Sequence, residues 1–207
     1  MTRRPPWFSR LGDVPGIDYA SRGIDRRRLT AHDARPVVVD EFKLGKERLQ
    51  VIEWQWSGGA SRTSPVREHG LSADESHSPA EWIQKLREAL ELPGELSDYH
   101  FAITGTAATL WNLRREHPEV METAEELWWL DIALVEAKPE TVEYERGEER
   151  AYYSLPAFAS LASMYEQQGF VREALDVTER ARRFGQLDDA RERLRAKLET
   201  LEAEPDG

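Results

Sequence analysis

The sequence predicts a mainly α-helical protein that begins with an extended arm and a small β-hairpin. Apolar residues recur at helical spacing through most of residues 77–207. Proline and glycine interrupt the first 35 residues too often for a long helix. Apolar and polar residues alternate over residues 52–56, which is the period of a half-buried strand. We therefore expect two domains, an arm, hairpin and loop over residues 1–76 and a helical domain over residues 77–207.

The composition excludes several classes of function. None of the 207 residues is a cysteine, so disulfide scaffolds, thiolate metal sites and cysteine nucleophiles are ruled out. The formal net charge is −11, which disfavours nucleic acid as a partner. No apolar run approaches the roughly 20 residues that a membrane helix needs. We expect a cytoplasmic protein without a membrane segment.

The net charge is distributed unevenly along the chain. Residues 1–76 carry 13 Lys or Arg and 11 Asp or Glu, a net charge of +2. Residues 77–207 carry 15 and 28, a net charge of −13. A basic N-terminal region is thus joined to an acidic helical body, and the two could attract each other.

The first elements in chain order are extended. The arm offers Trp7, Phe8 and Tyr19 for docking onto another surface. Strands are predicted over residues 36–42 and 49–56, joined by a turn around Gly45. The serine- and glycine-rich composition of residues 57–77 predicts a loop.

Helices follow from residue 78 onward. Ser78 and Glu81 have the spacing of a capping box, with proline at the first helical position. The next helices are predicted from Asp98 to about Glu116 and from about Glu119 to Lys138. A loop is expected over residues 138–151. From Tyr152 onward the chain is predicted to form three helices, separated by breaks at Gly169-Phe170 and Gly185-Gln186.

Large and small apolar residues alternate in the segment 155–186. Phe158, Leu161, Ala162 and Tyr165 fall at i, i+3, i+4 and i+7, so they share one helical face. Gly169 follows at the position of a left-handed helix cap. Ala174 then opens the apolar face of a second helix, and Ala181 lies farther along the same face. Small residues at these positions let two antiparallel helices pack closely.

This pattern, Phe-x2-Leu-Ala-x2-Tyr-x3-Gly-x4-Ala-x6-Ala, resembles the tetratricopeptide repeat. The resemblance covers residues 155–186 well and residues 98–139 weakly. It departs from the usual repeat at Thr178, commonly aromatic, and at Gln186, commonly proline. The resemblance implies antiparallel helix pairs, that is, a fragment of an α-solenoid, closed by a capping helix after Leu187.

The resemblance also implies a function and a binding surface. Proteins of this family are protein-binding scaffolds, so we expect a non-catalytic adaptor or assembly subunit whose partner is another protein. The implied groove positions are Ala159, Ser160, Ser163, Glu166 and Gln167. They lack the Lys and Asn residues that clamp a C-terminal carboxylate in the chaperone-binding branch. Such small residues leave room for a partner's side chain or helix, or for the N-terminal arm of the same chain.

Arg26, Arg27 and Arg28 form a basic cluster in the arm. Arginine binds phosphates and carboxylates bidentately. The cluster is therefore a candidate docking patch for an acidic partner. The alternative is that it pairs with the acidic body of the same protein.

Candidate catalytic and metal-binding residues are sparse. Glu68, His69, Asp74, Glu75 and His77 could contribute metal ligands, but nothing in a polar loop fixes their geometry. We expect no metal, no cofactor and no catalytic residue. The alternative hypothesis places an enzymatic or nucleic-acid-related activity in residues 1–76, with the helical body as its scaffold.

Overall fold

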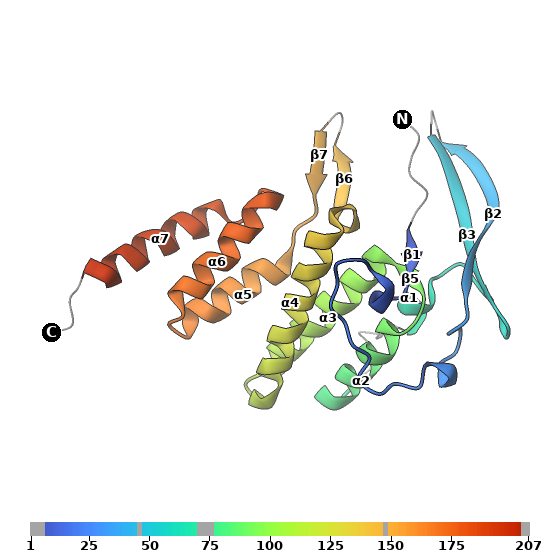
Figure 1. Ribbon diagram of the computed structural model, residues 1–207, viewed down its shortest axis with the longest axis horizontal. Coiled ribbons are helices and arrows are strands. Elements are labelled where there is room, and N and C mark those ends of the chain that lie inside the picture. Colours follow the sequence, from blue (N-terminus) through green and yellow to red (C-terminus); the bar gives the residue numbers. More distant parts are fainter. Residues whose placement is uncertain (1–6, 45–46, 70–76, 147–148, 204–207) are drawn as a thin grey trace. The chain divides into compact units, whose positions relative to one another are not determined.

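The computed structural model describes residues 7–44, 47–69, 77–146 and 149–203 and confirms a mainly helical protein with small sheets (Figure 1). The chain divides into two compact units, Met1–Ala124 (unit 1) and Glu125–Gly207 (unit 2). The boundary between the two units lies inside residues 77–207, which were predicted from the sequence to form a single helical domain. The reason is that the arm packs against the first helices of that region and forms one unit with them.

The N-terminal arm docks within unit 1. Its strand β1 (Phe8–Ser9) pairs antiparallel with β5 (Gly94–Glu95). Leu11 and Val14, which follow β1, are almost completely buried. Further along, the Tyr19 hydroxyl donates a hydrogen bond of 3.1 Å to Glu91. The arm therefore contributes Leu11 and Val14 to the core of unit 1.

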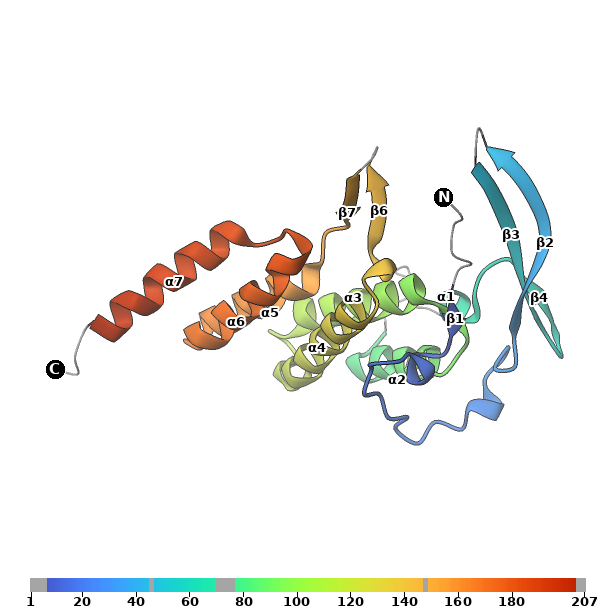
Figure 2. The ribbon, with the colours of Figure 1, turned by 45° about the horizontal axis from the view of Figure 1, so that its top comes forward.

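The predicted hairpin is confirmed as strands β2 (Arg35–Leu44) and β3 (Glu47–Trp56), which pair antiparallel. A third strand, β4 (Gly59–Ser61), pairs with the end of β3, so the sheet order is β2-β3-β4. Figure 2 shows β2 and β3 extending beyond the helices of unit 1. Trp54 anchors the base of this sheet, because it is only 2% exposed and packs against Ala31 and Ala34.

The helices of unit 1 are α1 (Pro65–His69), α2 (Pro79–Leu90) and α3 (Leu96–Leu113). The predicted capping box of α2 is confirmed, since Ser78 Oγ accepts from the Glu81 amide at 3.4 Å and Glu81 accepts from the Ser78 amide at 2.8 Å. The prediction of a loop over residues 57–77 was wrong for β4 and α1. Ser64 starts α1 by accepting a hydrogen bond from the Arg67 amide at 3.2 Å.

Helix α4 (Met121–Ala137) begins at the end of unit 1 and continues into unit 2. The hairpin of β6 (Glu143–Arg146) and β7 (Glu149–Tyr152) follows it. The predicted loop over residues 138–151 was therefore wrong. The segment is dominated by charged residues, so its sequence shows no clear strand pattern. In the structure, the Tyr144 and Tyr153 rings pack together at the base of the hairpin, with their centroids 4.7 Å apart.

Three helices complete unit 2: α5 (Pro156–Gln167), α6 (Val171–Ala181) and α7 (Asp188–Ala203). Both predicted helix breaks are confirmed, with left-handed φ values of +88° at Gly169 and +65° at Gly185. Ala162, Ala174 and Ala181 are buried, as their spacing predicted. Ala174 also contributes to a cluster with Val171 and Leu194 that joins α6 to α7.

Within the described part of the chain, no helix combines the length and the apolar character needed to cross a bilayer.

Candidate docking site

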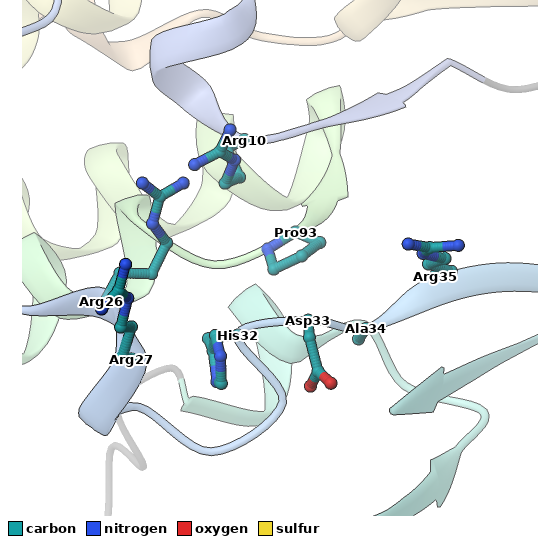
Figure 3. Close-up of a pocket in the computed structure, with 8 residues that line it drawn as sticks. All are labelled: Arg10, Arg26, Arg27, His32, Asp33, Ala34, Arg35 and Pro93. Atoms are coloured by element: carbon teal, nitrogen blue, oxygen red, sulfur yellow. The ribbon is translucent and has the colours of Figure 1, made fainter. Parts of the chain in front are cut away.

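A cleft of about 440 Å³ with basic walls lies in unit 1 (Figure 3). Segments that are far apart in the sequence form it: the end of β1, the turn at residues 26–28, the start of β2 and the turn before β5. Its lining residues are Arg10, Arg26, Arg27, His32, Asp33, Ala34, Arg35 and Pro93.

Local interactions place the arginines along this cleft. Asp25 begins the 3₁₀ turn Arg26–Arg28, and its Oδ1 accepts from the Arg27 amide at 3.2 Å. Ala31 has a left-handed φ of +59° and lies in the turn that precedes β2. Because Ala31 and Ala34 pack against Trp54, the residues between and after them are held beside the cleft.

The positive charge of the cleft is largely uncompensated. Arg10 forms an ion pair of 2.7 Å with Asp13. Among the residues that the structure describes, Arg26, Arg27 and Arg35 have no ion pair. The Arg26 guanidinium points toward that of Arg10 (Figure 3). Two neighbouring cations repel each other, so an anion bound between them would lower the electrostatic free energy of the site.

One carboxylate belongs to the lining, but it is turned away from this pair. The Asp33 side chain points away from Arg10 and Arg26 (Figure 3), and its Oδ2 accepts from the Ser57 amide at 3.3 Å. Desolvation opposes ionisation of Asp33, but the hydrogen bonds from Ser57, together with the backbone amide of Asp33 itself and the nearby His32, lower its pKa overall. Asp33 is therefore ionised and hydrogen-bonded to Ser57. It does not neutralise Arg10 and Arg26, so these arginines can bind a ligand.

The structure brings only part of the predicted patch to this cleft. Arg26 and Arg27 line it. The Arg28 side chain is 86% exposed and pairs with Asp25 at 3.4 Å. Sequence reasoning missed Arg10 and Arg35, because no regular spacing relates them to the cluster.

The five predicted groove residues all lie on α5 in unit 2. Ala159, Ser163 and Gln167 are exposed, and Gln167 Nε2 donates to Ser163 Oγ at 2.9 Å. Ser160 is partly buried. Glu166 is engaged inside the unit by α7, so it is not available to a partner.

Two cations of α7 hold the Glu166 carboxylate. Arg193 donates to both of its oxygens, one of them at 2.7 Å, and Lys197 Nζ lies 3.2 Å from Oε1. The hydrogen bonds from Arg193 are the largest cause that lowers the pKa of Glu166 to about 2. This network links α5 directly to α7.

We expect the Glu166 network to stabilise unit 2 in a pH-dependent manner. Its pKa is lower in the folded chain than in the unfolded chain, so the stabilisation is complete above about pH 5 and is lost as the pH falls toward about 2. When the pH is lowered from about 5 to about 2, the free energy of unfolding of the wild type should fall by about 1 kcal/mol more than that of the Glu166→Gln variant. Urea unfolding across this range measures the difference.

Glu192→Gln is the matched control, because Glu192 is exposed on α7 and forms no ion pair with any described residue. It should follow the wild-type pH profile. Identical acid sensitivity of wild type and Glu166→Gln would show that this network contributes nothing to stability.

The two histidines that were considered as metal ligands have other partners. His69 Nε2 lies 3.0 Å from Glu88. His77 packs edge-on against Trp82 with ring centroids 5.6 Å apart. Asp74 and Glu75 lie outside the described residues. Within the described ranges, no three His, Asp or Glu side chains come together as a set of metal ligands.

No protein-family model, curated protein or solved structure matches this chain.

Proposed function

We propose that this protein is a non-catalytic adaptor that recognises an acidic segment of another protein. The observation that carries this proposal is the basic cleft, in which Arg26, Arg27 and Arg35 have no acidic partner among the described residues. Guanidinium groups bind carboxylates through paired hydrogen bonds. A segment with several Asp or Glu side chains would supply the missing negative charge.

In this proposal, unit 2 is a tetratricopeptide-like scaffold that provides a second contact. Three observations support it: the left-handed Gly169 between α5 and α6, the buried alanines at their contact, and the attachment of α7 through Leu194. Because Glu166 is held by α7, the surface left for a partner consists of the remaining predicted groove residues, Ala159, Ser160, Ser163 and Gln167.

The basic cleft can be tested with a labelled hexaglutamate peptide and the full-length chain. We expect saturable binding that weakens as salt increases, since salt screens the attraction. Replacing Arg26 and Arg27 together by Glu should weaken binding by at least about tenfold, because it converts two attractive charges into repulsive ones. Fluorescence anisotropy measures the affinity, and hexaglutamine is the uncharged reference peptide.

Arg28→Glu is the matched control for this experiment. Arg28 belongs to the same 3₁₀ turn but does not line the cleft. Its replacement should change the affinity by less than about twofold. Equal loss in the control and the double variant would indicate non-specific attraction and contradict the proposal. Tighter binding of a single-stranded oligonucleotide than of hexaglutamate would favour the nucleic-acid alternative.

A further inference from the structure

A second cavity of about 440 Å³ lies in unit 1, between α1 with its preceding loop and the first turns of α3. Its two walls carry opposite charges. Arg62 and Arg67 come from the loop and α1, whereas Glu95 and Asp98 come from the start of α3. The cavity contains none of the cationic residues of the basic cleft.

The charged side chains on both walls of the cavity can still bind a ligand. Neither Arg62 nor Arg67 forms an ion pair with a residue that the structure describes. Glu95 and Asp98 cap α3 reciprocally: the Glu95 amide donates to Asp98 Oδ2 at 3.1 Å, and the Glu95 side chain accepts from the Asp98 amide. These two bonds leave each carboxylate with acceptor positions for a ligand.

The anionic wall is partly shielded from water. Desolvation, and then the neighbouring charge of Asp98, raise the pKa of Glu95, while Arg67 across the cavity opposes the rise. A partly desolvated carboxylate interacts more strongly with a cation than one in bulk water does. A ligand ammonium group would thus be favoured at this wall.

An exposed aromatic ring adds an apolar surface to the cavity. Phe101, on the same helix as Glu95 and Asp98, is 61% exposed. Trp54 and Val66 are buried and form apolar parts of the lining. Clefts that combine apolar walls with a few convergent polar groups are typical of small-molecule sites. Phe101 can cover the hydrocarbon part of such a ligand.

We propose that this cavity binds a small zwitterion with an apolar side group, such as an α-amino acid or a short peptide. The ligand carboxylate pairs with Arg62 and Arg67, the ammonium group with Glu95 and Asp98, and the apolar group packs on Phe101. The four protein charges sum to zero, so a simple anion or cation meets one repulsive wall, whereas a zwitterion satisfies both.

Three probes test this proposal by calorimetry on the full-length chain: L-phenylalanine, the dipeptide Phe-Gly, and N-acetyl-L-phenylalaninamide, which lacks both charges. We expect at least one zwitterion to bind at least about tenfold more tightly than the blocked compound. Comparing L-phenylalanine with Phe-Gly distinguishes an amino-acid site from a peptide site. Failure of both zwitterions to bind at millimolar concentration, or equal binding of the blocked compound, would overturn the proposal.

Variants locate the bound probe. Glu95→Gln and Arg67→Gln should each weaken binding by at least about tenfold, since each removes one charge from one wall. Glu68→Gln is the control, because Glu68 is exposed on α1 and does not line the cavity. Wild-type affinity in both cavity variants would overturn the proposal. Arg67 is exposed, so Arg67→Gln remains informative even if Glu95→Gln destabilises the cap of α3.

Discussion

Replacing Trp54 by alanine is expected to lower the free energy of unfolding of unit 1 by about 3–5 kcal/mol. Trp54 is 2% exposed, and Phe8 contacts it edge-on with ring centroids 5.2 Å apart. It also packs against Ala31 and Ala34. Its loss would open a cavity where the arm, the start of β2 and the sheet meet, and packed interiors close such cavities only partly.

The same substitution should impair the basic cleft. Ala34 and Arg35 line the cleft, and the burial of Ala34 under Trp54 holds this part of the chain in place. We expect Trp54→Ala to weaken hexaglutamate binding and to increase amide hydrogen exchange around residues 31–38. Urea unfolding and hydrogen-exchange mass spectrometry measure these effects.

Gln55→Ala provides the control from the same strand. Gln55 is exposed, and successive side chains of a strand point to opposite faces. Its replacement should change stability by no more than about 0.5 kcal/mol. If Trp54→Ala were as stable as this control, Trp54 would not anchor unit 1, and the origin of the cleft would need another explanation.

In unit 2, Ala174→Leu is expected to cost about 1–3 kcal/mol through overpacking. Ala174 is completely buried on α6. It lies in a cluster with Val171 of the same helix and Leu194 of α7. A larger side chain would push α6 away from the neighbouring helices. The loss of stability should appear in urea unfolding and as faster hydrogen exchange within α5–α7.

The exposed residue Asp176 supplies a position on α6 for comparison. Asp176→Leu introduces the same side chain outside the core, and it should change stability by no more than about 0.5 kcal/mol. If Ala174→Leu left stability unchanged within error, close packing of small residues would not hold α6 in place. The proposal that unit 2 is a tetratricopeptide-like scaffold would then have to be abandoned.

Local sequence patterns were sufficient for the helices α2 to α7, although they missed the short helix α1. The cap at Ser78, the breaks at Gly169 and Gly185, and the burial of Ala174 all follow from residues a few positions apart. Hydrogen bonding in a helix connects residues four positions apart, so its signals are short-range. For the same reason α5, α6 and α7 could be predicted without knowledge of their packing.

Strands with charged neighbours were harder to predict. The segment containing β6 and β7 reads as an acidic loop, and β4 is only Gly59–Ser61. Pairing with a neighbouring strand stabilises such segments, and side-chain periodicity in the strand itself is weak. Their existence depends on a partner strand that composition does not reveal.

The candidate sites required the tertiary structure most. The sequence pointed to Arg26 and Arg27, but Arg10 and Arg35 join them only because β1 pairs with β5 and Trp54 holds the start of β2. The opposed charges of Arg67 and Glu95 likewise come from separate elements. Helix periodicity and caps are encoded among near neighbours, whereas a binding cleft depends on long-range packing that brings distant side chains together.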